Sequence, residues 1–310
     1  MSDLLTHWAV FEDLRRFAQV DPLMEPLFAR LMDEDREYAR LGAISRGGNR
    51  IVPQVLQSAR AQYPSAEPRK LELRLAFALG MITHFPTDKV LKPLMSELAQ
   101  ADWSSSHNQA QGKSGIPQDT RQDMDTIREI SAYFDVHVFR QVYLSGQEEP
   151  FTHFLVGENT TSPGQALEEF IRALFQRSLL ASHTFDPDWE NLDGWLDNLI
   201  GKIQPLYVHI STYSRVFYHP DPAKIAKYQV ESAFYFQDDP AIQAARRLQR
   251  GEAVRQAELA AAWAPGANQS GYGRVLELGV QTLRVASAYW QGRSADLPDV
   301  KQGYKWVPNN

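Results

Sequence analysis

The 310-residue sequence contains no cysteine, and this absence removes several kinds of function at once. Without thiols the chain cannot form disulfide bonds, thiolate metal sites or a cysteine nucleophile. Any tight metal site therefore has to be built from histidine, aspartate, glutamate and water.

The sequence also lacks an excess of positive charge and any long apolar run. Lysine and arginine total 32 against 38 aspartate and glutamate, a formal net charge of −6, so we expect no nucleic acid partner. No run approaches the roughly 20 apolar residues that a transmembrane helix needs. The first residues show neither the basic stretch nor the apolar stretch of a secretory signal. We therefore expect a soluble, cytoplasmic protein.

Three catalytic signatures are missing as well. There is no Gly-x-Ser-x-Gly turn, no glycine-rich phosphate loop followed by lysine, and no dinucleotide-binding glycine pattern. Hydrophobic residues make up 43% and charged residues 23%, which is ordinary for a globular protein with a buried core.

The hydrophobic residues that are present recur with a period close to 3.6, which predicts an all-α fold, a multi-helix bundle. No sustained strand-type alternation interrupts this pattern. We expect helices at about 3–19, 22–41, 51–62, 68–84, 87–101, 121–145, 165–182, 188–218, 222–236, 239–249, 252–263 and 269–291. Polar or glycine-containing breaks at 42–49, 102–120 and 158–164 separate them. Residues 1–160 and 161–310 are expected to pack as two regions of one compact unit.

Three of the predicted helices carry a histidine on their apolar stripe: His7, His84 and His137. Residues three or four apart share one helix face, so each imidazole should point inward. Asp88 lies four residues after His84, so one face offers an imidazole and a carboxylate to the same ion. Any one such histidine could instead be a core residue bonded to a backbone carbonyl, and the spacing alone leaves both alternatives open.

The segment Ala76-Phe-Ala-Leu-Gly-Met-Ile-Thr-His84-Phe-Pro-Thr-Asp88 resembles the core motif of the bacterial zinc-dependent phospholipase C-like family. The similarity continues in order through about residues 5–145. Its other parts are Thr6-His7-Trp8, Leu41-Gly-Ala-Ile-Ser45, Lys92-Pro93 and His137-Val-Phe-Arg-Gln141. The resemblance implies a helical bundle that holds up to three zinc ions, with a metal-activated hydroxide attacking a phosphoester.

Several positions depart from that family's pattern. Ser45-Arg46 stands where the family has Pro-Asp, Lys92 replaces a histidine, and Gln141 replaces a glutamate. Pro86 also lies between His84 and Asp88, where its ring nitrogen cannot donate a helical hydrogen bond.

Four candidate ligands survive, which is enough for one zinc ion: His7, His84, Asp88 and His137. His107, in the expected loop, could replace a lost ligand or could simply be solvated. Near the ion we expect Asp88 to act in catalysis, with Lys92 and Arg46 binding the substrate phosphate.

Two functions remain open. The first is a phosphoester hydrolase with about one metal ion, acting on a phosphate-containing small molecule or a lipid headgroup. The second is a catalytically inactive relative that keeps the helical scaffold for binding or structure. In that case Lys92 or Arg46 would pair with Asp88 and replace the metal with an ion pair. The substrate and the oligomeric state do not follow from the sequence.

Overall fold

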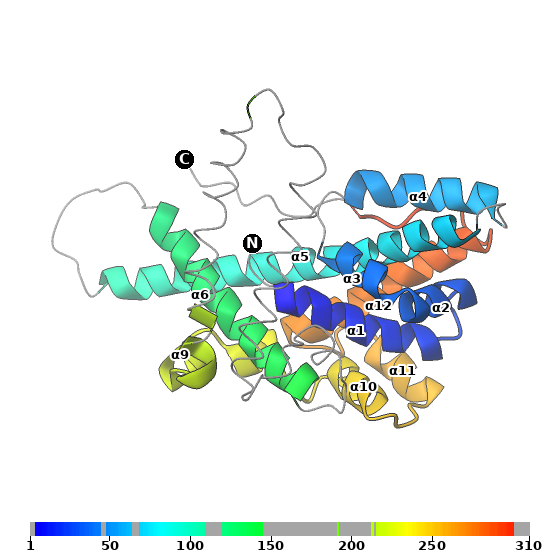
Figure 1. The fold of residues 1–310 in the computed structure, drawn as a ribbon. Coiled ribbons are helices and arrows are strands. Elements are labelled where there is room, and N and C mark those ends of the chain that lie inside the picture. The colour runs from blue at the N-terminus through cyan, green and yellow to red at the C-terminus, as the bar shows by residue number, and fades with distance from the viewer. Residues whose placement is uncertain are drawn as a thin grey trace, which may run out of the picture.

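The computed structural model describes residues 4–44, 48–63, 68–108, 120–144, 191, 212–213 and 215–300. Within these residues the chain is predominantly helical and contains no strand, which confirms the all-α prediction (Figure 1). The phospholipase C type of bundle stays a prediction. Among the described residues, no helix combines the length and the hydropathy that a membrane span requires.

The described elements follow one another along the chain in this order. They are α1 (Leu4–Val20), α2 (Pro26–Glu34), α3 (Arg36–Ala43), α4 (Gly48–Gln62), α5 (Pro68–Asn108), α6 (Thr120–Val138), the π-helix η1 (Phe139–Leu144), α9 (Pro222–Lys227), the π-helix η2 (Val230–Phe234), α10 (Pro240–Gln249), α11 (Gln256–Ala262) and α12 (Gly271–Trp290). The predicted helices at 165–182 and over most of 188–218, and the predicted boundary near 160, lie outside the described residues.

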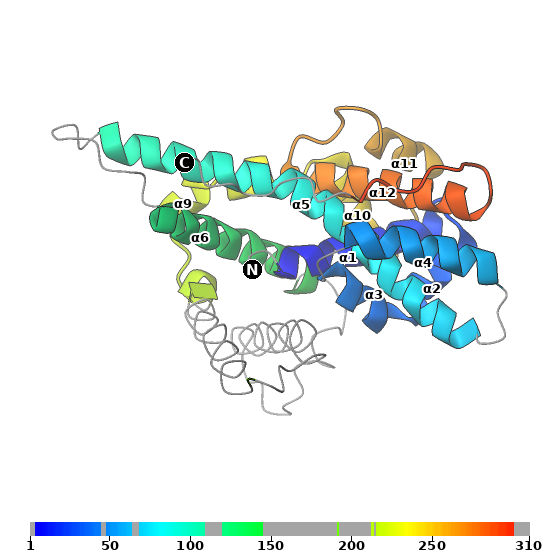
Figure 2. The same ribbon diagram turned by 90° about the horizontal axis from the view of Figure 1, so that it is seen from above.

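Helix α5 is the centre of the fold. Its 41 residues extend for about 60 Å, and it packs against α1, α2, α3, α4, α6 and α12. Figures 1 and 2 show α5 running across the molecule, with α12 beside one end and α6 beside the other. Leu79, Ile82 and Leu91 of α5 are fully buried. Residues far apart in the sequence therefore share one core.

The prediction of a helix break after residue 84 is wrong. Helix α5 continues through Pro86 and Pro93, and it reaches Asn108, seven residues into the segment 102–120 that we expected to be a loop. A proline removes one backbone hydrogen bond, which is a local cost. Phe85 and Leu91 on either side of Pro86 are buried, and this burial keeps the helix continuous.

Two other predicted helices are divided in the structure. The predicted helix 22–41 begins at Pro26 and splits into α2 and α3 at Asp35, whose side chain accepts hydrogen bonds from Arg69. The predicted helix 222–236 becomes α9 and η2, because Gln229 between them has a left-handed backbone with φ 49°. Helical periodicity continues across both positions, so it does not reveal these breaks.

Two glycines allow α3 and α5 to approach each other more closely than other residues would permit. A Cβ atom at Gly42 would lie 2.0 Å from the carbonyl oxygen of Phe77, and one at Gly80 would lie 1.8 Å from that of Ala39. These are backbone atoms, which cannot move aside as a flexible side chain can. The contact brings the carboxyl end of α3 against the middle of α5.

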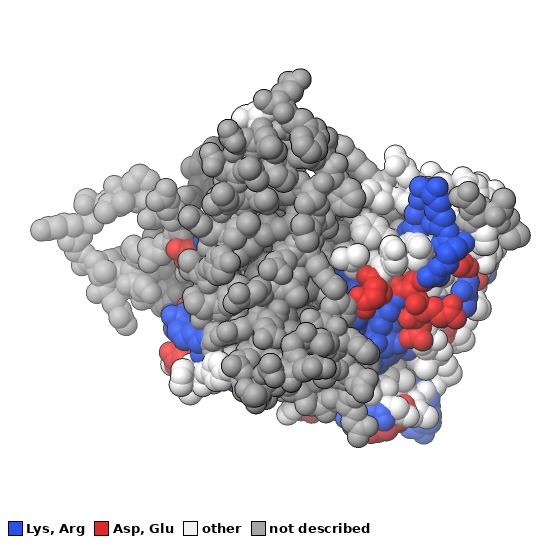
Figure 3. All heavy atoms as spheres, in the orientation of Figure 1, with Lys and Arg blue, Asp and Glu red and all other residues white. Residues whose placement is uncertain are grey.

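A buried charge cluster joins α1 to α3. The Glu12 carboxylate is fully buried and accepts hydrogen bonds from Arg36 and Arg40 of α3 and from Arg15 of its own helix. Figure 3 shows that charged side chains of both signs gather on this side of the molecule, in the region of α2, α3 and α4. The surface drawn there is therefore mixed in sign rather than basic.

Replacing Gly80 with alanine should destabilise the protein severely, because the new methyl group would overlap the backbone of α3. We expect Gly80→Ala to lower the free energy of unfolding by at least about 3 kcal/mol. Gly279→Ala is the matched control, since the three atoms nearest to its Cβ would all belong to the side chain of Leu14 rather than to the backbone. Denaturant unfolding of both variants measures the difference, and equal losses would contradict the close α3–α5 contact.

The Glu12 cluster should also make stability depend on pH. Burial alone would raise the pKa of Glu12, but Arg40, Arg36 and then Arg15 outweigh it and hold this pKa well below its ordinary 4.5. A depressed folded-state pKa contributes stability above pH 4.5 that is lost as the pH falls below that value.

Glu12→Gln should therefore cost about 3 kcal/mol at pH 7 and less at pH 3, where the carboxylate of the unfolded chain is already protonated. Unfolding curves recorded between pH 7 and pH 3 test this expectation. Glu252→Gln removes an exposed ion pair with Arg250 and serves as the control, because solvent screens such a pair and its loss should leave stability nearly unchanged.

Candidate functional site

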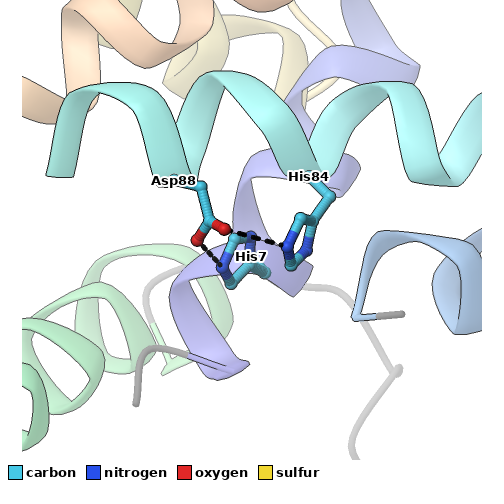
Figure 4. Close-up of side chains that lie close together, drawn as sticks. All are labelled: His7, His84 and Asp88. Atoms are coloured by element: carbon cyan, nitrogen blue, oxygen red, sulfur yellow. Dashed lines mark ion pairs between the residues drawn. The ribbon is translucent and has the colours of Figure 1, made fainter. Parts of the chain in front are cut away.

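Three of the four predicted metal ligands meet at one buried point. His7 comes from the first turns of α1, whereas His84 and Asp88 lie on adjacent turns of α5 (Figure 4). The Nε2 atom of His7 lies 3.4 Å from Oδ1 of Asp88, and Nε2 of His84 lies 3.3 Å from Oδ2. All three side chains are buried, and each offers a ligand atom within 4.8 Å of the others. These side chains could hold a metal ion, as the sequence predicts.

The close contact between α3 and α5 orients the His84 ring. Its Nδ1 atom lies 2.9 Å from the backbone carbonyl oxygen of Ala43, the last residue of α3. A carbonyl oxygen only accepts, so Nδ1 carries the proton. The other ring nitrogen, Nε2, faces Oδ2 of Asp88. The bond from Nδ1 to the Ala43 carbonyl is the contact expected of a core histidine, the alternative that the sequence left open. Metal-binding histidines are commonly oriented by the same kind of bond.

Burial and mutual contact perturb the pKa values of His7 and Asp88. Burial first, and then the neighbouring His84, lowers the pKa of His7 to about 4, so His7 is neutral at pH 7. Burial also opposes ionisation of Asp88, but the contacts from His7 and His84 outweigh it and hold the pKa of this carboxyl far below its usual range. The site therefore contains a buried anion that needs a compensating positive charge.

Lys92 supplies such a charge. Its ammonium group hydrogen-bonds to Oδ2 of Asp88 from the next turn of α5. The Lys92 side chain is 32% exposed, whereas that of Asp88 is 7% exposed. The lysine thus reaches inward from the edge of the core and bonds the same carboxylate oxygen that faces His84.

The orientation of the two imidazoles limits how one metal ion could be held. The rings of His7 and His84 are stacked, with centroids 4.1 Å apart and an angle of 7° between their planes. An ion bound to an imidazole nitrogen lies near the plane of that ring, because the lone pair lies in this plane. Two parallel stacked planes share no such position. One ion bound by both rings therefore requires one ring to turn.

The structure does not bring His137 to this group. His137 lies near the end of α6, and its ring packs edge-on against Tyr235, 5.1 Å away between centroids. Burial, followed by the charge of Arg140, lowers the pKa of His137 to about 4.

The other predicted site residues are placed only in part. Ser45 and Arg46 lie outside the described residues, so the expected contact of Arg46 with phosphate has no structural account. Gln141 belongs to η1, and its backbone carbonyl oxygen accepts a hydrogen bond from Arg246. His107 lies in the last turns of α5 rather than in a loop.

Sequence reasoning missed a second buried carboxyl group near the site. Asp135 of α6 accepts hydrogen bonds from Thr6, the neighbour of His7, and from Tyr213. Burial raises the pKa of Asp135 to about 6, although these hydrogen bonds oppose the rise. An aspartate one residue after Phe134, among the apolar residues of that helix, was the only signal available.

No protein-family model, curated protein or solved structure matches this chain. The resemblance to zinc-dependent phospholipases C therefore rests on the motifs alone.

Removing the Lys92 ammonium should destabilise the folded protein, because it leaves Asp88 with an uncompensated buried charge. We expect Lys92→Met to cost about 1–3 kcal/mol in buffer with chelator. Lys89→Met is the matched control, since Lys89 lies on the same helix and is exposed. Chemical unfolding measures both variants, and equal effects would show that the Lys92–Asp88 pair contributes nothing to stability.

Proposed function

We propose that this chain is a non-catalytic helical scaffold, a binding or structural protein in which an ion pair replaces the metal centre of phospholipase C-like enzymes. The contact between Lys92 and Asp88 carries this proposal. The ammonium group bonds the carboxylate that the resembling family uses for metal, and a cation in this position repels a neighbouring divalent ion.

The arrangement of the histidines supports the same proposal. His7 faces Oδ1 of Asp88 and His84 faces Oδ2. Two separate ions bridged by Asp88 would each receive only one imidazole and one carboxylate oxygen from these three residues. Stable zinc sites in proteins use three or four protein ligands. Lys92 instead neutralises the carboxylate without any further ligand.

The sequence substitutions agree with the loss of a site for several cations. The changes at Ser45-Arg46, Lys92 and Gln141 each replace an expected ligand with a neutral or positively charged residue. Each change lowers the affinity for cations, and together they favour a scaffold over a hydrolase.

A second candidate function is a phosphoester hydrolase with one zinc ion, and one observation favours it. The bond from His84 Nδ1 to the carbonyl oxygen of Ala43 leaves Nε2 ready to bind a metal. In this alternative one imidazole turns, His7, His84 and Asp88 hold the ion, and Lys92 moves to the substrate phosphate. Arg46 would assist it there.

Metal content and activity separate the two functions. If the chain is a scaffold, protein produced with zinc in the medium should hold far less than one ion per chain, and chelator should leave its melting temperature unchanged. Hydrolysis of bis(p-nitrophenyl) phosphate with added zinc should remain at the rate of buffer. The Lys92 ammonium already occupies the carboxylate, so we expect no gain on adding metal.

One ion per chain, together with a melting temperature that falls in chelator and an activity abolished by His84→Ala, would establish the hydrolase instead. A bound metal contributes binding free energy to stability, about 2.7 kcal/mol when its free concentration is 100 times the dissociation constant. His219→Ala serves as the control for loss of an unrelated histidine.

A further inference from the structure

His7, His84 and Asp88 together form the Asp88 group, and Asp135 is a fully buried acid that takes no direct part in it. Its two oxygens bond different parts of the chain. Oδ1 accepts from the backbone amide of Thr6 at 2.9 Å and from the Thr6 hydroxyl at 2.6 Å. Oδ2 accepts from the Tyr213 hydroxyl at 2.6 Å. One carboxyl group of α6 thus joins the amino end of α1 to the carboxyl-terminal half of the chain.

The bond to the Thr6 amide satisfies a group that the helix itself leaves unpaired. Helix α1 begins at Leu4, and the first amides of a helix have no acceptor in the preceding turn. A carboxyl group in this position also interacts favourably with the helix dipole. A residue of another helix therefore helps to cap the amino end of α1.

Thr6 directly precedes His7, and successive residues of a helix point about 100° apart. Thr6 is directed at α6, while His7 is directed at α5, where it faces Asp88 and stacks on His84. Any shift of the Thr6 turn along or around the axis of α1 moves His7 by a similar amount.

We propose that Asp135 is a positioning residue that holds His7 in the Asp88 group, and that Tyr213 completes this connection. This role of Asp135 rests on the proposed function and deepens it, because Asp135 holds His7 in place beside Asp88. Contacts run from Tyr213 through Asp135 and Thr6 to His7. A change at residue 213 is thereby transmitted to the buried centre, although Tyr213 lies 206 positions after His7 in the sequence.

The same helix contains a bond of the same chemical kind without this connection. The Tyr228 hydroxyl donates to Glu129 of α6 at 2.8 Å, and Glu129 otherwise pairs with Arg215 and Lys224. Tyr228→Phe therefore removes a tyrosine-to-carboxylate bond on α6, and the other described partners of that carboxylate, Arg215 and Lys224, do not belong to α1. This variant is the matched control for Tyr213→Phe.

The test compares four variants of the full-length protein with the wild type at one fixed pH. Tyr213→Phe and Thr6→Val each remove one donor to Asp135, Thr6→Ser keeps the hydroxyl, and Tyr228→Phe is the control. Imidazole carbon and proton resonances of His7 and His84, labelled selectively and assigned from His7→Gln and His84→Gln spectra, report the geometry of the centre. Hydrogen exchange of the Thr6 amide reports the first turn of α1.

We expect Tyr213→Phe and Thr6→Val to move the resonances of His7 and His84 and to speed exchange of the Thr6 amide about tenfold or more. Thr6→Ser should restore the wild-type spectrum. Tyr228→Phe should leave the His7 and His84 resonances in place even if it lowers the melting temperature as much as Tyr213→Phe does.

Unmoved His7 resonances in Tyr213→Phe and Thr6→Val, alongside the same loss of thermal stability, would overturn the inference and leave Asp135 a merely structural residue. If both variants fail to fold, the wild type still decides, because a Thr6 amide that exchanges as fast as an unprotected amide would equally overturn it. A metal ion found in the wild type would refute the scaffold function, whereas this inference is decided by comparing each variant with the wild type in the same chelator-treated state, so the two failures are distinguishable.

Discussion

The buried carboxylate of Asp88 imposes the strongest constraint on this structure. An ionised carboxyl group away from water is costly unless positive charge and hydrogen-bond donors surround it. In this chain the ammonium group of Lys92 and the imidazoles of His7 and His84 surround it, and they come from two helices. In the proposed scaffold the Lys92 ammonium group balances this charge, whereas in the alternative hydrolase a metal ion balances it.

The constraint extends outward through backbone contacts. His84 is oriented by the carbonyl group of Ala43, and this carbonyl reaches it only because Gly42 and Gly80 let α3 and α5 touch. On the other side, His7 belongs to the helix turn that Asp135 bonds. The glycines and the second carboxyl group serve the centre although none of them belongs to it.

Much of the fold and part of the site could be predicted from the sequence. Helical periodicity correctly indicated an all-α chain and placed His7, His84 and Asp88 on inward faces, where they meet. The same reasoning placed His137 on an inward face, but periodicity does not tell which neighbour a face meets, and His137 meets Tyr235. The break expected near Pro86 did not occur, because burial of the residues around it offsets one lost hydrogen bond. The role of Asp135 depends on a contact across 129 positions, which no local pattern contains.

The continuity of α5 has a consequence for how the centre can change shape. His84 and Asp88 project from consecutive turns of a single uninterrupted helix, so the pitch of that helix sets the spacing of their backbones. Ligands, partners or substitutions cannot spread these two residues apart without unwinding α5 within the core. His7 stands on a separate helix, so rearrangement of the centre must proceed by displacement of α1 or by rotation of side chains.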